Sequence, residues 1–337
     1  MDVNWRGSTV ESKAGDRRRA RRSRPNPEFA HGQLAPGLLR NPEHAFETTM
    51  VETADGARLH VREYGPATAP RIVLIHGYAC RIEYWNPQIN QLADHYRVIV
   101  PDLRGHGRSS QGELPFSVAL AGSDLSAVLA ATVPPGSRAV LAGHSLGGIT
   151  IMSWAAQFPE EVHRYARSVA LISTVAERFA AHTLLLPFAG DRRVRREQLI
   201  DSLLGRLPIP DPRLLGPAFG FTALSRAATR DQVRFTASLA ATCANPFRSR
   251  VLSFLRQIDV TDGLANLTVP TTVIVGAADR LTPPSASRRI VDLISHTGNR
   301  PRYVEVPRHG HCVNLEDPDT VTAEIERMAA LEHRSAG

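Results

Sequence analysis

Residues 138–158, RAVLAGHSLGGITIMSWAAQF, contain the pattern that decides the fold. An apolar run leads into the motif GHSLG at residues 143–147, and small and apolar residues follow it. The pattern G-x-S-x-G between a strand and a helix is typical of a nucleophile elbow, a strained turn that exposes the serine hydroxyl. The flanking glycines permit the turn, and the helix N-terminus favours negative charge beside it. Ser145 is therefore a candidate nucleophile; the alternative is that it only caps the helix.

Strand-like and helical segments alternate on both sides of this turn. Two strands around an Asp55-Gly56 turn are expected first. Apolar runs typical of buried parallel strands follow at residues 71–77, 97–101, 168–174, 271–279 and 302–307. Helical spacing occurs at residues 85–96, at 116–133 with Ser117 as N-cap, and after Pro318. This order predicts an α/β fold, with a mostly parallel central sheet and helices on both faces.

The alternation is absent before the core and is interrupted once within it. Residues 1–44 are rich in Arg and Pro without lasting periodicity, which favours a disordered tail. Residues 45–174 form the first part of the predicted core and 261–337 the second part. Residues 175–260 have helical segments and no strand-like run, so we expect a helical cap inserted between two strands of the sheet.

Composition limits the classes of function. The net charge is +7, but residues 1–44 hold nine basic and five acidic residues, so the body is only mildly basic. We therefore expect no specific nucleic-acid partner, although the tail could make weak contacts with an anionic surface. The three cysteines lack metal-site or disulfide spacing, and we expect a cytoplasmic protein. No apolar run is long enough to predict a transmembrane segment, and no signal peptide is recognisable.

A serine nucleophile needs a base, and the base needs an orienting acid. Asp279 follows the strand-like run TTVIVG, at the carboxyl end where sites in parallel sheets gather. Asp259 and Asp262 are the reserve candidates, and Asp279 could instead pair with a neighbouring arginine at the surface. The loop after the last strand offers two histidines, His309 and His311. The local sequence does not choose between them.

Five motifs in this order make the chain resemble an α/β-hydrolase of the lipase/esterase and cofactor-free haloperoxidase type. They are LIHGYA (74–79), a segment ending in VIVPDLRGHGRS (85–109), LAGHSLGG (141–148), VIVGAADRLTPP (273–284) and GHCVNLEDP (310–318). The resemblance covers roughly residues 46–335. In this family the base is the histidine of a Gly-His pair, which implies His311 and leaves His309 as a surface or supporting residue.

The resemblance also implies an oxyanion hole. Two fixed donors are needed for the tetrahedral intermediate, and these would be the backbone N–H groups of Tyr78 and Leu146. His76 is expected to be a hydrogen-bonded core histidine that helps hold this loop. His106 is expected to support a turn, with no catalytic role.

The predicted function is hydrolysis of a carboxylic ester, with a small or lipid-like acyl group, through an acyl-enzyme formed by Ser145, His311 and Asp279. The same triad could serve C–C bond, thioester or amide hydrolysis, or perhydrolysis as in haloperoxidases. A more distant alternative is a non-catalytic ligand-binding protein. No cofactor or metal is expected. Apolar residues at 184–186 and Phe188 suggest a small-molecule substrate with an apolar part, although they could equally be cap core. The sequence leaves the oligomeric state open.

Overall fold

The computed structural model describes residues 37–177, 220, 222–243 and 258–331. Its centre is an eight-stranded sheet in the order β1-β2-β4-β3-β5-β6-β7-β8. The strands are β1 (Phe46–Glu52), β2 (Arg58–Tyr64), β3 (Arg71–Ile75), β4 (Arg97–Pro101), β5 (Ala139–His144), β6 (Ala166–Ile172), β7 (Thr271–Gly276) and β8 (Arg302–Val306). β1 pairs with β2 and β2 with β4 in antiparallel fashion, and all the other pairs are parallel. The predicted fold class is confirmed.

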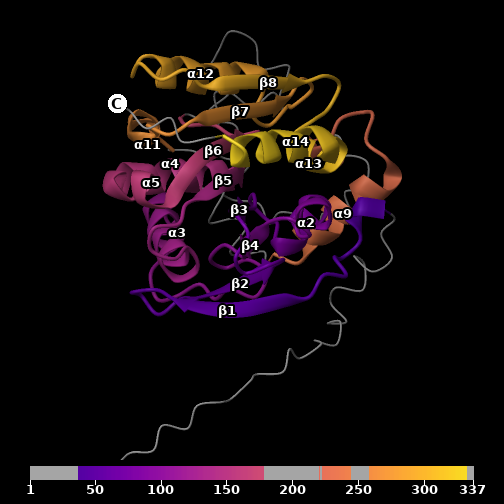
Figure 1. The fold of residues 1–337 in the computed structure, drawn as a ribbon. Helices are drawn as coiled ribbons and strands as arrows, with labels where there is room; N and C mark the ends of the chain where they lie inside the picture. The colour runs from indigo at the N-terminus through magenta and orange to yellow at the C-terminus, as the bar shows by residue number, and fades with distance from the viewer. Residues whose placement is uncertain (1–36, 178–219, 221, 244–257, 332–337) are drawn as a thin grey trace, which may run out of the picture.

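Helices cover both faces of the sheet (Figure 1). One face carries α3 (Val118–Thr132), α4 (Leu146–Gln157), α5 (Pro159–Tyr165), α11 (Thr261–Asn266) and α12 (Pro284–Ser295). The other carries α2 (Asn86–Leu92), α9 (Arg230–Ala241), α13 (Val313–Glu316) and α14 (Pro318–Ala329), together with the 3-10 helices η2 (Gly37–Leu39) and η3 (Ile82–Trp85). Two apolar cores result, one on each side of the sheet. The inner strands β4 and β5 are therefore buried along their whole length.

Local sequence signals set several element boundaries. The β1–β2 hairpin turns at Asp55-Gly56, where Gly56 adopts a φ of 75°. The Ser117 hydroxyl accepts a hydrogen bond from the N–H of Leu120 and begins α3 as predicted. α4 ends at Gln157, and Pro159 starts the separate helix α5 at its first position, where a missing N–H costs nothing.

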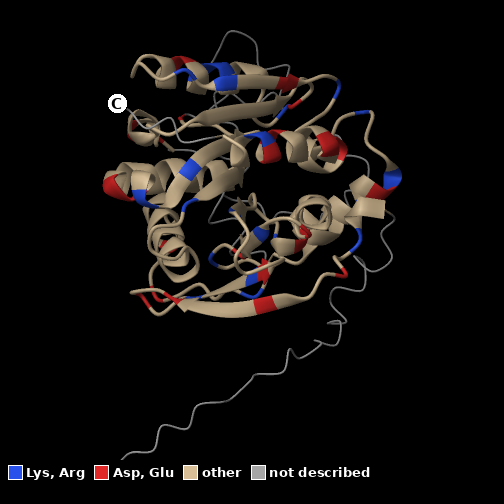
Figure 2. Ribbon diagram, viewed as in Figure 1, with Lys and Arg blue, Asp and Glu red and all other residues tan. Residues whose placement is uncertain are grey.

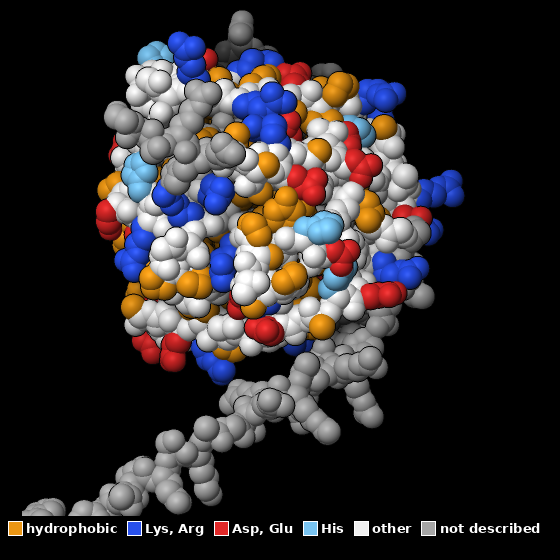
Figure 3. All heavy atoms as spheres, viewed as in Figure 1, with side chains coloured by type: hydrophobic (Ala, Val, Ile, Leu, Met, Phe, Trp, Pro, Cys, Tyr) orange, Lys and Arg blue, Asp and Glu red, His pale blue; other side chains and the backbone are white. Residues whose placement is uncertain are grey.

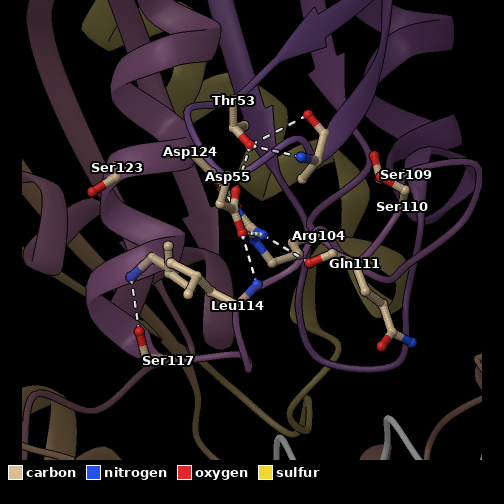
Figure 4. A network of polar contacts seen from close by, with 12 residues as sticks. Thr53, Asp55, Arg104, Ser109, Ser110, Gln111, Leu114, Ser117, Ser123 and Asp124 are labelled. Atoms are coloured by element: carbon tan, nitrogen blue, oxygen red, sulfur yellow. Dashed lines mark hydrogen bonds and ion pairs between the residues drawn. The ribbon is translucent and has the colours of Figure 1, made fainter.

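A buried ionic network ties the hairpin to the helical layer (Figure 4). The guanidinium of Arg104, 1% exposed, uses its five N–H groups to bond Asp55, Asp124 and the carbonyl of Gln111 at 2.6–2.9 Å. The hydrogen bond from Arg104 holds the pKa of Asp55 below its usual range, whereas burial raises the pKa of Asp124. Arg104 thus fixes the loop after β4 between β1–β2 and α3.

The described chain starts before residue 44, the expected end of the tail. Asn90 of α2 donates through its side-chain amide to the carbonyls of Leu38 and Arg40, at 3.1 and 2.9 Å. Residues 37–44 therefore contact the folded core. Residues 1–36 lie outside the described residues, as does most of the predicted cap with residues 184–186 and Phe188.

Among the described residues, charges of both signs alternate on the face shown in Figure 3. Basic and acidic residues are likewise interspersed along the ribbon in Figure 2. None of the helices in the described part of the chain has the length and apolar character needed to cross a bilayer.

Candidate active site

Ser145 occupies a strained turn between β5 and α4. Its φ of 51° and ψ of −113° lie outside the regions that non-glycine residues prefer. The turn is tight because the backbone on either side is crowded: a Cβ at Gly147 would lie 2.2 Å from the carbonyl oxygen of Ile75, and one at Gly143 would lie 2.5 Å from that of Gly147. The strand–turn–helix context predicted for the motif is therefore present, with strain stored at the serine.

Asp279 and His311 meet at the carboxyl ends of β7 and β8. Nδ1 of His311 lies 2.9 Å from Oδ2 of Asp279, and both side chains are buried. Oδ1 of Asp279 accepts from the N–H groups of Leu281 and Thr282, both at 2.9 Å, and Oδ2 accepts from the Thr282 hydroxyl at 2.8 Å. These bonds hold the Asp279 carboxylate in place, so that Oδ2 accepts a hydrogen bond from Nδ1–H of His311. The imidazole is then held in the tautomer whose Nε2 has a free lone pair.

His144 joins the turn at Ser145 to His311. Its Nε2 lies 2.9 Å from the backbone carbonyl of His311, and the two rings are 4.8 Å apart between centroids. Burial lowers the pKa of His144 well below its ordinary value, so the ring is neutral. Because a carbonyl only accepts, Nε2 must carry the proton of this ring. Asp279 thus contacts His311 directly. Ser145 is linked to His311 through His144, the residue that precedes it.

The loop after β3 passes against the serine. A Cβ at Gly77 would lie 3.3 Å from Cβ of Ser145 and 2.7 Å from Nδ1 of His144, so only glycine permits this approach. Tyr78 follows at once, and Leu146 is the first residue of α4 on the other side of Ser145. The two residues predicted to supply oxyanion donors therefore lie on segments that flank the serine.

Two buried histidines hold that loop. Nε2 of His76 accepts from the N–H of Leu103 at 3.0 Å, and Nε2 of His106 accepts from that of Ala79 at 3.1 Å. Burial lowers both pKa values, that of His106 to about 3. Asp102 accepts from the N–H of Ile82 and lies 2.8 Å from Nδ1 of His60. His76 and His106 are thus hydrogen-bonded core residues.

The other residues considered for the triad lie elsewhere. His309 is 22% exposed at its side chain and lies 3.9 Å from Glu316 and 3.8 Å from Asp317. Asp259 accepts from the N–H and hydroxyl of Thr261 on an exposed turn, and Asp262 is in the first turn of α11. In the structure, Asp279 is the candidate acid that contacts His311.

Comparison with known proteins agrees with this geometry. Residues 72–325 match the model of the alpha/beta hydrolase family. The chain belongs to that family. It is 26% identical over 292 residues to 3-oxoadipate enol-lactonase 2 of Acinetobacter baylyi, covering 85% of this chain and 98% of the relative. It is 27% identical over 263 residues to the pimeloyl-[acyl-carrier protein] methyl ester esterase of Pectobacterium carotovorum, covering 77% and 93%.

A solved structure gives the same result. The crystal structure of a hydrolase from Pseudomonas aeruginosa superimposes on this alpha/beta hydrolase with a TM-score of 0.65 and 26% identity, covering 85% of this chain and 99% of that one. Family and fold together make the protein a hydrolase.

Sequence reasoning missed three residues of the hydrolase that support the site. Thr282 lies three positions after Asp279, a spacing that is typical of side-chain-to-backbone turns and could have indicated its role. His144 stands inside the GHSLG motif, but the motif alone indicates no role for it. Tyr84, whose hydroxyl lies 3.0 Å from Nε2 of His144, follows no local pattern, because the contact depends on the packing of η3 against the sheet.

Proposed function

We propose that the protein hydrolyses carboxylic esters through an acyl-enzyme carried by Ser145. The observation that carries the proposal is the 2.9 Å hydrogen bond between Asp279 and His311, made at the same edge of the sheet as the strained turn of Ser145. A buried carboxylate, an oriented imidazole and a serine at a strained turn are the parts that nucleophilic catalysis requires.

The reaction would proceed in two halves. Nε2 of His311 takes the proton of the Ser145 hydroxyl as Oγ attacks the ester carbonyl. The backbone N–H groups of Tyr78 and Leu146 donate to the oxyanion of the tetrahedral intermediate. Collapse of the intermediate breaks the bond to the alcohol, which receives the proton from His311. Water, deprotonated by the same imidazole, then attacks the acyl-enzyme and releases the acid and the free serine.

Asp279 would stabilise the imidazolium that forms in each half. Its carboxylate is held by two backbone N–H groups and a hydroxyl, so it need not reorganise when the charge appears on His311. The tight turn at Ser145 would present its side chain at the carboxyl end of the sheet, beside the loop after β3.

We propose a small acyl ester or lactone with an apolar part as the substrate. The two relatives named above support this class, because an enol-lactone is a cyclic ester and the other relative cleaves a methyl ester.

The test combines turnover and labelling. Purified protein should hydrolyse short-chain p-nitrophenyl esters and should be labelled by a fluorophosphonate, and Ser145→Ala should lose both properties while keeping its thermal unfolding temperature. A panel of ester, lactone, thioester and amide substrates of matched acyl group should rank the esters first. A wild-type protein that neither turns over an ester nor takes the label would refute the proposal.

A further inference from the structure

One buried carboxylate outside the triad contacts both the loop of His311 and residues that belong to the predicted cap. The side chain of Glu316, in α13, is 1% exposed. Its Oε1 accepts from the N–H of Gly310 at 3.0 Å, and its Oε2 accepts from the N–H of Ser225 at 3.0 Å. Each oxygen thus serves a different segment. A buried charge is stable only when it is paired or bonded in this way.

The two segments are also packed directly on each other. A Cβ at Gly310 would lie 2.5 Å from the backbone nitrogen of Ser225 and 2.6 Å from the carbonyl carbon of Leu224. The N–H of Cys312 donates to the carbonyl of Ala223 at 3.2 Å. Residues 223–225 therefore touch the chain on both sides of His311, and the glycine of the Gly-His pair is the residue that makes room for them.

We propose that Glu316 is a positioning residue that holds the loop of His311 and residues 223–225 in one fixed arrangement. This inference rests on the proposed function, because it assigns Glu316 a role through the base of that reaction. The Gly310 bond sets the backbone immediately before His311, while His144 holds the carbonyl of His311 itself. A displacement of residues 223–225 is transmitted through Glu316 to the imidazole of His311. These residues of the predicted cap and the catalytic base therefore move together.

The substitution Glu316→Gln tests this with little change of volume. An amide has one acceptor oxygen, so one of the two backbone N–H groups would face an NH2 group and lose its bond. A misplacement of the base of about 1 Å costs up to about 100-fold in rate. We expect kcat for p-nitrophenyl butyrate, per active site titrated with a fluorophosphonate, to fall by about tenfold or more.

Glu324→Gln is the matched control. Glu324 lies in α14, is 12% exposed and accepts hydrogen bonds from Arg302 and Arg327, away from the loop of His311. This variant should lose thermal stability but keep its turnover per titrated site. Counting titrated sites separates positioning from folding, because a merely structural residue changes the number of active molecules and not the rate of each.

The outcomes are distinct. Wild-type turnover with an unchanged rate per site in Glu316→Gln overturns the role of Glu316 and leaves the ester hydrolase intact, whereas a wild type without turnover refutes the proposed function itself. Should Glu316→Gln fail to fold, Glu316→Asp decides, because its shorter side chain keeps the charge but cannot reach both N–H groups. If neither variant folds, Glu316 is needed for folding alone and the inference is overturned.

Discussion

Replacing Asp279 by Asn should remove most of the activity and leave the fold intact. Oδ1 accepts two backbone N–H groups, from Leu281 and Thr282. An NH2 group in that place would leave both donors unpaired, at about 1–3 kcal/mol each. The amide oxygen must therefore take the position of Oδ1, and the NH2 group then faces Nδ1 of His311 in place of Oδ2.

The consequence is a change of tautomer. The NH2 group donates to Nδ1, so the neutral imidazole carries its proton on Nε2 and cannot take the proton of Ser145. In a Ser-His-Asp triad this exchange lowers kcat by about 10⁴-fold, or about 5.5 kcal/mol of transition-state stabilisation. The remaining activity would come from the proposed backbone donors, Tyr78 and Leu146, and from substrate binding.

The assay is steady-state hydrolysis of p-nitrophenyl acetate together with the rate of fluorophosphonate labelling. Both rates should fall together in Asp279→Asn, while thermal unfolding shifts little because Asn has the same shape. Asp259→Asn is the control, since that carboxylate bonds Thr261 on an exposed turn. Activity of Asp279→Asn within tenfold of wild type, or an equal loss in Asp259→Asn, would refute the assignment of the acid.

Three further changes test other parts of the structure. His311→Ala should abolish ester turnover and His309→Ala should keep most of it; the reverse result would move the base to His309. Arg104→Met leaves two carboxylates without their buried partner and should lower the free energy of unfolding in urea by about 3–5 kcal/mol, whereas Arg288→Met, at an exposed ion pair, should cost less than about 1 kcal/mol. Burial alone would raise the pKa of Asp102, but its hydrogen bonds lower this pKa from 3.8 to about 2. The ionised carboxylate therefore stabilises the folded state fully above pH 4, and this contribution to the free energy of unfolding is lost as the pH falls toward 2. Urea unfolding from pH 5 to 2 should show a loss of about 2 kcal/mol from this group that is missing in Asp102→Asn, and equal slopes in both proteins would contradict it.

Local patterns predict the fold well because each signal acts over a few residues. The Asp55-Gly56 turn and the Ser117 cap follow from interactions between residues close in the sequence. The apolar strands follow from short apolar runs that alternate with helical segments. The order of motifs then predicts which loops meet at the carboxyl edge of the sheet. That reasoning reaches Ser145, which directly follows β5, and Asp279, which lies three residues after the end of β7.

Contacts across the molecule are beyond such patterns. Glu316 bonds a residue 91 positions away, and His144 bonds the carbonyl of a residue 167 positions away. Both contacts depend on how the helices pack on the face of the sheet that carries α2, α13 and α14. No local spacing in the sequence encodes that packing. The choice of His311 over His309 came from the resemblance to a family. The physical reason becomes visible only in three dimensions: Nδ1 of His311 lies 2.9 Å from Asp279, whereas His309 lies beside Glu316.

The three buried histidines around the site affect how a pH–rate profile of this enzyme should be interpreted. Their burial lowers the pKa of His76, of His106 and of His144, so all three stay neutral near pH 7 and serve as fixed donors and acceptors. The hydrogen bonds that hold the loop after β3 therefore need no protonated histidine near pH 7. An ionisation seen at pH 7 or above therefore belongs to groups other than these three rings. The chain has thirteen histidines, and these three can be treated as rigid scaffold when a titration is fitted.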